Sequence, residues 1–290
     1  MGINKKGLAV CLLCYVLWGT LPAYWNLLSG VNPLLILCGR IFFAFLFTMG
    51  LLAVSGRARE MLNTLKDKKK MRCLIPSSML ITFNWGLYIW AVNNGRIFDA
   101  SLGYYMLPLM SFVFGLLIFR EKSTKLQLAA IALAFAGVMI SVIAFGNFPV
   151  ISLGLALSFM LYGALKRVAG ADPVAGIAIE SLLFSPFALV LAFVFLPDSV
   201  RAVSAVDVLL LIGGGALTAV PLILFSRAVS DIPFIVVGFL QYLSPSLTLT
   251  YGLIIGEMLS ASQIVSFAFI GLGLVLFSIA IVRKTKKSLT

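Results

Sequence analysis

The amino-acid sequence predicts an all-α integral membrane protein with ten transmembrane helices, built from two inverted five-helix repeats. Three observations predict this fold class: a strongly apolar composition, ten apolar segments with basic residues gathered on one side of them, and motifs of the first half that return in the second. Of the 290 residues, 61% are hydrophobic and 11% are charged, whereas a soluble domain is nearer half apolar and a quarter charged. The expected solvent of this chain is therefore a lipid bilayer.

Ten apolar segments follow one another along the chain, and most approach the ~20 residues that cross a hydrocarbon core. They cover residues 8–28, 33–54, 73–92, 99–119, 126–145, 149–168, 174–196, 207–229, 234–255 and 262–282. The first segment follows Lys5 and Lys6, as the apolar part of a signal peptide would. It contains Trp18 and Pro22 and has no A-x-A cleavage site, so an uncleaved helix is expected. Later segments contain prolines that are expected to kink their helices: Pro108, Pro186, Pro221 and Pro245.

The basic residues predict the orientation, because cytoplasmic loops carry an excess of Lys and Arg. With the N-terminus inside, only Arg96 and Arg201 of the 22 basic residues fall in outer loops, and Arg40 lies within a helix. The inner side holds Lys5, Lys6, Arg57, Arg59, Lys66, Lys68, Lys69, Lys70, Arg72, Arg120, Lys122, Lys125, Lys166, Arg167, Arg227, Arg283, Lys284, Lys286 and Lys287. Both termini are therefore expected in the cytoplasm. The basic run 57–72 is expected to be a solvated loop near anionic lipid.

The two halves of the chain share motifs in the same order. The matching positions are Trp18-Gly19 with Tyr162-Gly163, Pro33 and Arg40 with Pro173 and Glu180, Ala91-Val92 with Ala228-Val229, and Pro108, Gly115, Glu121 and Gln127 with Pro245, Gly252, Glu257 and Gln263. Each half holds five expected helices, and because five is odd, the second half must enter the membrane from the opposite side. Such inverted repeats are typical of alternating-access transporters. The expected repeats are residues 1–146 and 147–290.

Polar and aromatic residues recur on single faces of the expected helices, at positions i, i+3, i+4 and i+7. The faces are Tyr15, Trp18, Gly19 and Pro22; Ser101, Tyr104, Tyr105 and Pro108; and Gly238, Gln241, Tyr242 and Pro245. Lipid-facing surface has no use for hydroxyls, amides or helix-breaking prolines, whereas a protein-lined cavity does. The pattern therefore predicts a cavity near the membrane midplane. The candidate substrate-binding residues are Trp18, Asn84, Tyr88, Ser101, Tyr104, Tyr105, Tyr162, Gln241 and Tyr242.

An aromatic cavity with few charges suits a neutral, zwitterionic or weakly cationic amphipathic solute, such as an amino acid or an aromatic drug. Asn84 lies too deep in its expected helix to reach water, so its amide needs a partner. That partner is either a ligand or another helix.

Arg40 and Glu180 are the charges most clearly inside expected helices. An ionisable group there is costly, so it has either a functional role or a structural partner. Each follows a helix-starting proline by seven residues, which places it about 10 Å from its own membrane face at ~1.5 Å per residue. In a core of about 30 Å, roughly 10 Å of depth separates the two, so no direct salt bridge is expected.

Arg40 is expected to bond backbone carbonyls or a substrate carboxylate. Glu180 is the candidate proton carrier, because the other carboxylates lie nearer water. Glu121 and Glu257, at helix ends, are expected to be interfacial anchors.

Several other functions lack the residues that they need. The chain has no histidine, the commonest metal ligand and general base, so neither a metal nor an organic cofactor is expected. It has no Walker loop, which excludes ATP hydrolysis by this chain. Cys11 and Cys14 lie in an apolar helix and are expected to be small apolar filler. The net charge of +12 belongs to membrane loops rather than to nucleic-acid binding. A membrane-embedded enzyme and a channel stay as alternatives to a transporter, without a catalytic constellation or a filter motif to support them.

Two blocks of the first half carry a family resemblance: Tyr15, Trp18-Gly19, Pro22 and Tyr24, and the stretch NWGLYIWAVNNGRIFDASLGYYMLPL at 84–109. The second half adds Tyr162-Gly163, Lys166-Arg167, Glu180, Pro221-Leu222, Gly238-Phe239, Gln241-Tyr242, Pro245 and Gly256-Glu257. These blocks resemble RarD-type permeases, of the EamA family in the drug/metabolite transporter superfamily. Gly39 stands where that family often has a histidine, and Gly271 where it often has a tryptophan. The Gly39 departure argues against a histidine-based proton relay.

The resemblance implies ten helices in two EamA-type repeats and a place in the bacterial inner membrane. It also implies a permease or exporter of drugs or metabolites, with chloramphenicol sensitivity as the family label. It leaves the solute, the direction of transport, proton coupling and the oligomeric state open.

Overall fold

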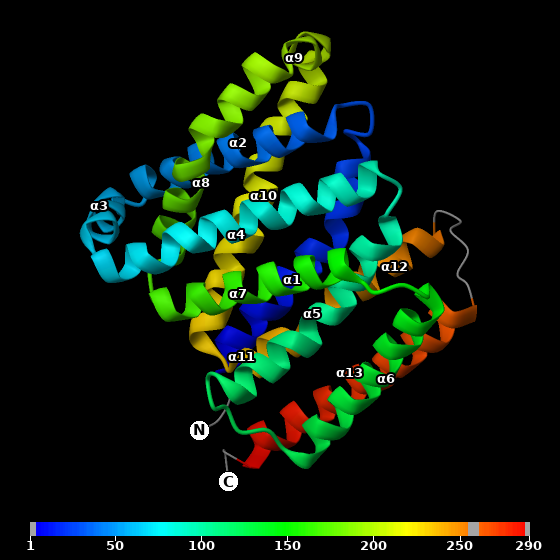
Figure 1. The fold of residues 1–290 in the computed structure, drawn as a ribbon. Helices are drawn as coiled ribbons and strands as arrows, with labels where there is room; N and C mark the ends of the chain where they lie inside the picture. Colours follow the sequence, from blue (N-terminus) through cyan, green and yellow to red (C-terminus); the bar gives the residue numbers. More distant parts are fainter. Residues whose placement is uncertain (1–3, 255–260, 288–290) are drawn as a thin grey trace.

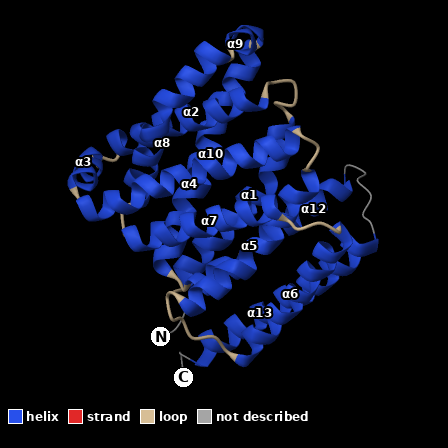
Figure 2. Ribbon diagram, in the orientation of Figure 1, coloured by secondary structure: helices blue, strands red, loops and turns tan. Residues whose placement is uncertain are grey.

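The computed structural model describes residues 4–254 and 261–287, and the elements in these residues are all helical (Figures 1 and 2). In chain order they are α1 (Lys5–Asn26), α2 (Pro33–Val54), α3 (Ala58–Lys66), α4 (Lys68–Asn93), α5 (Ile97–Leu117), α6 (Lys125–Phe145), α7 (Val150–Ala169), α8 (Pro173–Val190), the π-helical η1 (Leu191–Phe195), α9 (Pro197–Ala202), α10 (Ala205–Asp231), α11 (Phe234–Leu240), α12 (Leu243–Ile254) and α13 (Ala261–Lys287). Among the described residues, nine helical spans are long and apolar enough to cross a membrane. The chain is therefore an all-helical membrane protein.

The segment expected at 73–92 forms α4, which is not among the nine apolar spans. Its side chains explain the difference, because Ser77, Ser78 and Asn84 are polar but buried inside the molecule. Polar groups that face other helices lower the hydropathy of a span without meeting lipid. Each of the ten expected segments thus has a helical counterpart among the described residues, while ten membrane crossings stay a prediction.

Helix starts follow the local chemistry of the sequence. Asn32 and Asp172 cap α2 and α8 with side-chain oxygens that accept backbone N–H groups, and Pro33 and Pro173 occupy the first helical turns. Proline suits that turn because its missing N–H has no intrahelical partner there. Thr124 begins α6 with a reciprocal capping box. These signals explain why the expected and observed starts of α2 and α8 differ by one residue at most.

The expected kink at Pro245 is a break between two helices. Residues Gln241 and Tyr242 form a turn that separates α11 from α12. A proline has no N–H to donate, and its ring clashes with the carbonyl four residues earlier, which here belongs to Gln241. Pro108, at the matching position of the first half, lies within the continuous helix α5. The break is therefore confined to the second half.

The helices pack in pairs that join the two halves of the chain. α2 contacts α8 and α10, α1 contacts α10 and α12, and α7 contacts α4 and α5. α6 and α13 lie side by side at one edge of the molecule (Figure 1). The start of α1 and the end of α13 lie at the same end, at the lower left of Figure 1. At Gly215, α10 approaches α2 so closely that a Cβ would collide with Phe43, and this approach places Thr218 beside Arg40.

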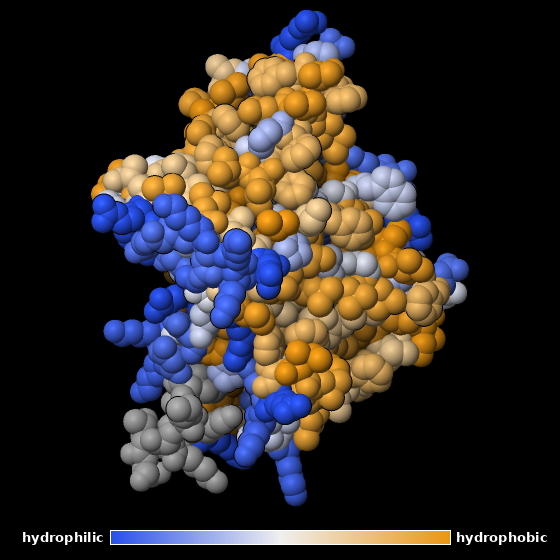
Figure 3. Space-filling model, turned by 60° about the vertical axis from the view of Figure 1, so that its left-hand side comes forward, coloured by the Kyte–Doolittle hydropathy of each residue, from blue (hydrophilic) through white to orange (hydrophobic). Residues whose placement is uncertain are grey.

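The surface has the distribution of a membrane protein. Figure 3 shows a mainly hydrophobic face, with a hydrophilic patch gathered toward the side on which α3 lies in Figure 1. On that side Arg57 contacts Asp172, the cap of α8, and lies 2.6 Å from Glu60. Hydrogen bonds to Glu60 and then Asp172 raise the pKa of Arg57 above its ordinary value. This contact ties α3 to the start of α8.

Candidate functional site

Arg40 lies among aromatic side chains of the neighbouring helices. Its guanidinium carbon is 4.8 Å from the ring centroid of Trp25 on α1 and 4.5 Å from that of Trp85 on α4. Its Nε donates a hydrogen bond of 3.1 Å to Oγ1 of Thr218 on α10. Each cation–π contact contributes about 0.5–2 kcal/mol, depending on how far the cation is desolvated. Among the described residues, Arg40 is thus held by rings and a hydroxyl and not by a backbone carbonyl. The other expected partner, a substrate carboxylate, stays a prediction.

Tyr88 of α4 and Tyr104 of α5 face each other beside Arg40. Their ring centroids are 5.8 Å apart in an edge-to-face arrangement, and both lie within electrostatic range of the guanidinium. Each tyrosine is 37% exposed, although protein atoms surround both at longer range. Both side chains are therefore packed among other helices and still partly accessible. Ser101, one turn before Tyr104, is also exposed, so three predicted site residues lie on this accessible part.

Two other predicted aromatics belong to the core region: Tyr162 lies inside the buried core, and Trp18, partly buried, packs against it. The ring of Trp18 lies 5.6 Å from Phe159 and 5.5 Å from Phe225. Tyr162 is fully buried and stacks on Phe225, with centroids 6.0 Å apart and 10° between the planes. Trp18 and Tyr162 occupy matching positions in the two halves, so the structure brings these matching positions to the same phenylalanine.

The remaining predicted aromatics meet at the break between α11 and α12. Tyr242 is fully buried, and its hydroxyl donates a hydrogen bond of 3.0 Å to the backbone carbonyl of Tyr105. The ring of Tyr105 lies 5.2 Å from that of Phe267 on α13. Gln241 is buried in the same turn. These contacts of the three residues do not include Arg40.

Asn84 is bonded to another helix. Its Nδ2 donates to the carbonyl of Leu155 at 2.8 Å and to Oγ of Ser158 at 2.9 Å, both on α7. The sequence left either a ligand or another helix as the partner of this amide, and in the structure the partner is a helix, α7. Asn84 therefore fastens α4 to α7 from a buried position.

Glu180 is part of a buried ion pair. Its Oε1 lies 3.0 Å from Nζ of Lys166, and the two side chains are 5% and 2% exposed. Ser77 donates a hydrogen bond to the same carboxylate, and the hydroxyl of Tyr162 donates another at 3.3 Å. The sequence grouped Lys166 with the basic residues of the inner side, whereas the structure buries its side chain in the last turn of α7. Arg40 and Glu180 have separate partners, as their expected depths require.

Several residues that the structure places beside Arg40 or Glu180 are not among those predicted to line the cavity. Lys166 is four residues after Tyr162, and Trp25 is seven after Trp18. Both spacings lie on one helical face, so the facing pattern could have identified them. No pattern in the sequence singles out Thr218, whose contact with Arg40 joins residues 178 positions apart.

Glu121 does more than anchor a helix end at the interface. Its carboxylate accepts hydrogen bonds from the backbone N–H groups of Phe234, at 2.7 Å, and Ile235, at 2.9 Å, at the start of α11. It also lies 2.7 Å from Nη1 of Arg167 on α7. A carboxylate is favoured at the positive end of a helix dipole. The matching residue, Glu257, lies outside the described residues.

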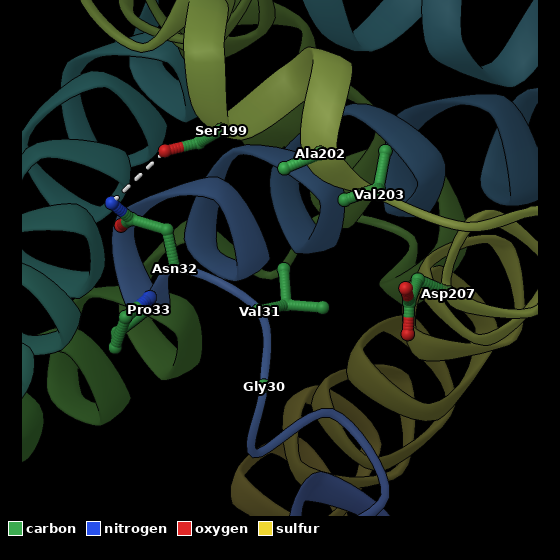
Figure 4. Close-up of a pocket in the computed structure, with 8 residues that line it drawn as sticks. All are labelled: Gly30, Val31, Asn32, Pro33, Ser199, Ala202, Val203 and Asp207. Carbon is green, nitrogen blue, oxygen red and sulfur yellow. Dashed lines mark hydrogen bonds between the residues drawn. The ribbon is translucent and has the colours of Figure 1, made fainter.

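A hollow in the described part of the molecule lies elsewhere. Figure 4 shows this hollow, of ≈ 410 Å³, between the α1–α2 connection, α9 and the start of α10. Asn32 donates a hydrogen bond of 3.2 Å to Ser199 at its side, and Asp207 lines it as well (Figure 4). None of the predicted site residues lines this hollow. It is a surface feature of the outer connections in the expected topology.

Comparison with known proteins identifies the family. Residues 5–143 match the model of the EamA-like transporter family. The chain is 37% identical to an uncharacterized transporter, YojE, of Bacillus subtilis, covering 98% of this chain and 97% of YojE. It is 35% identical to the protein RarD of Salmonella typhimurium, over 94% of this chain and 95% of that protein. A relative in Pseudomonas aeruginosa, named chloramphenicol-sensitive protein RarD, is 29% identical over 95% of this chain and 94% of its own length.

A solved crystal structure shares the fold. It superposes with a TM-score of 0.74 at 15% identity and covers 95% of this chain and 98% of its own. That likeness concerns the fold alone, while the close relatives and the family are those of transporters rather than enzymes. The chain therefore belongs to the EamA-like transporter family and is a multi-pass membrane transporter similar to the RarD proteins.

Proposed function

We propose that this protein is a secondary transporter of the bacterial inner membrane that moves small organic metabolites or drugs by alternating access. The observation that carries the proposal is the uneven accessibility along the predicted cavity. Tyr88 and Tyr104, in the outer part of the expected topology, are exposed, whereas Tyr162 and Glu180, in the inner part, are buried. A carrier must open to one side at a time, and this uneven accessibility supports an outward-facing state.

Two inverted repeats, residues 1–146 and 147–290, are the proposed moving units. The packing supports a structural relation between the two repeats, because contacts from one repeat to the other occur in matched pairs. α1 contacts α10 and α12 as α7 contacts α4 and α5, and α2 contacts α10 as α8 contacts α4. The family model matches almost the whole of the first unit by itself. Inverted repeats of this kind exchange conformations by rocking one unit against the other around a fixed site.

Glu180 is the proposed proton carrier. Protonation would neutralise its carboxylate and remove the ion pair with Lys166. The lysine would then lack its counter-charge in a buried place, which is unfavourable. Proton binding would thereby rearrange this cluster, which also holds Ser77 of the other unit, and favour opening of the inner part.

The solute is proposed to be an amino acid or an amphipathic aromatic compound, and counterflow in proteoliposomes tests the proposal. Vesicles that hold the purified protein are loaded with unlabelled solute and diluted into labelled solute. A carrier accumulates label transiently above equilibrium, a channel only equilibrates it, and an enzyme changes the solute chemically. The candidate solutes come from metabolites whose level differs between knockout and overexpressing cells. Equilibration without overshoot, for every such solute, would reject the carrier mechanism.

A further inference from the structure

We propose that Arg40, with Tyr88 and Tyr104 beside it, forms a subsite for the carboxylate of the transported solute. The solutes are then monocarboxylates with an aromatic or apolar body, amino acids among them. This inference rests on the proposed transport function and narrows its solute class, since a cationic drug without an acidic group has no partner at this subsite.

Arg40 is a partly buried cation that forms no ion pair with a carboxylate among the residues that the structure describes. The other intramembrane charge, Glu180, has Lys166 at 3.0 Å. The carboxylates of Asp99 and Glu121 have Arg96 and Arg167. An ionisable group inside a membrane protein is costly and is normally paired with a protein group or a ligand. The unmatched guanidinium therefore marks a place for an anion from outside the chain.

The contacts of Arg40 leave one edge of the guanidinium open. Nε is used by Thr218, and the rings of Trp25 and Trp85 lie over the guanidinium. Among the described residues, no hydrogen bond from Nη1 or Nη2 is present. These two groups can donate parallel hydrogen bonds to the two oxygens of one carboxylate. A single positive charge balances a monocarboxylate, whereas a phosphate ester would bring more charge than one arginine offsets.

The accessible tyrosines give the body of the solute a surface to pack against. Tyr88 and Tyr104 are the exposed aromatic members of the predicted lining, and both lie within electrostatic range of Arg40. Rings of this kind bind aromatic groups edge-to-face or offset-stacked, and their faces attract an ammonium group. A zwitterionic amino acid thus meets the guanidinium at one end and aromatic rings at the other.

The matching position of the second half strengthens the assignment. Arg40 and Glu180 each lie seven residues after the proline that begins their helix. Glu180 is surrounded by donors from Ser77, Tyr162 and Lys166, so its charge is already satisfied. Of the two equivalent positions, only that of Arg40 has an open edge and accessible neighbours. The asymmetry places the ligand contact in the first half.

Acid–amide pairs test the subsite by binding. The purified protein is heated with L-phenylalanine, phenylpropionate and benzoate, and with the amide of each, at equal millimolar concentrations. A ligand that binds the folded state raises the unfolding temperature, and at equal concentration the tighter ligand raises it more. At least one acid should stabilise the wild-type protein more than its amide does. Equal or larger shifts with the amides, or no shift with any acid, would overturn the carboxylate subsite.

Variants of Arg40 locate the effect. In Arg40→Gln, the concentration of acid that gives half the wild-type shift should rise about 10- to 100-fold, because charge-assisted hydrogen bonds are lost. Arg40→Lys keeps the positive charge but loses the bidentate hydrogen bonding of a guanidinium. Its affinity for the acid should therefore lie between those of the wild-type protein and Arg40→Gln. Arg201→Gln is the matched control, since Arg201 is an exposed arginine of the outer side, and it should bind as wild type does.

Counterflow separates the subsite from the proposed transport. Overshoot with acids that is lost in Arg40→Gln, but present in Arg201→Gln, supports both. Overshoot of amides as strong as that of acids overturns the subsite and leaves the carrier intact. An acid that stabilises the protein through Arg40 but never gives overshoot upholds the subsite and counts against the carrier. If Arg40→Gln does not fold, the acid–amide difference in the wild-type protein and the Arg40→Lys affinity decide the outcome.

Discussion

Removing the ammonium group of Lys166 should destabilise the protein far more than removing an exposed charge. Lys166 and Glu180 are 2% and 5% exposed, and Nζ lies 3.0 Å from Oε1. Lys166→Met keeps most of the apolar stem and removes the charge, so that the carboxylate of Glu180 is left buried with only hydroxyl donors. The perturbation therefore isolates the ion pair from the packing of the side chain.

The expected loss is about 3 kcal/mol. Deleting one partner of a buried ion pair costs ~3–5 kcal/mol, because an uncompensated charge stays in a low-dielectric site. The hydroxyls of Ser77 and Tyr162 still donate to the carboxylate, which places the loss at the lower end of that range. The double variant Lys166→Met, Glu180→Gln carries no buried charge and should regain much of the stability, with a coupling energy of about 2 kcal/mol in the mutant cycle.

The assay is the unfolding temperature of the detergent-solubilised protein, followed by loss of the monodisperse peak in size-exclusion chromatography after heating. Arg201→Met serves as control, since its pair with Asp198 is 3.5 Å long and the side chains are 79% and 95% exposed. An exposed pair contributes little, so the control should unfold as wild type does. The reasoning is refuted if Lys166→Met unfolds at the wild-type temperature, or if adding Glu180→Gln lowers stability further.

Three further predictions concern transport and topology. Glu180→Gln should abolish the dependence of transport on a pH gradient and spare solute exchange; full gradient-driven transport would show that Glu180 is structural. A reporter fused after Thr290 should be active only in the cytoplasm, and periplasmic activity would contradict ten crossings. Alanine at Tyr105 and at Gln241 should each impair transport while the protein stays in the membrane, because the ring of Tyr105 packs on Phe267 of α13 and Gln241 is buried in the turn between α11 and α12; unchanged uptake and efflux in both would refute their placement in the site.

The proposed mechanism requires the inner contacts to separate during transport. Glu121 joins the start of α11 to Arg167 of α7, and Glu180 joins α8 to Lys166 of the same helix. Both contacts converge on α7, which also packs along α4 and α5. We infer that α7 is the element whose displacement would open the inner side.

The sequence alone allows prediction of the features that depend on a few neighbouring residues. Each expected apolar segment corresponds to a helix, because a chain in lipid must satisfy its backbone hydrogen bonds internally. The caps at Asn32 and Asp172 begin helices as expected. The break falls at Gln241, four residues before Pro245, because proline has no N–H to donate and its ring clashes with the carbonyl at that position. Such features need only a few neighbouring residues.

Only the tertiary structure decided which polar groups are satisfied by the protein and which are open to a ligand. The sequence treated Asn84 and Tyr88 alike, yet the amide of Asn84 is bonded to α7 and Tyr88 is accessible beside Arg40. It placed Arg40 and Glu180 at equivalent positions, yet only Glu180 has an ionic partner among the described residues. Helical periodicity places a side chain on a face, but the partner comes from a helix far along the chain, as Thr218 does for Arg40. The packing of the whole molecule therefore determines the candidate site.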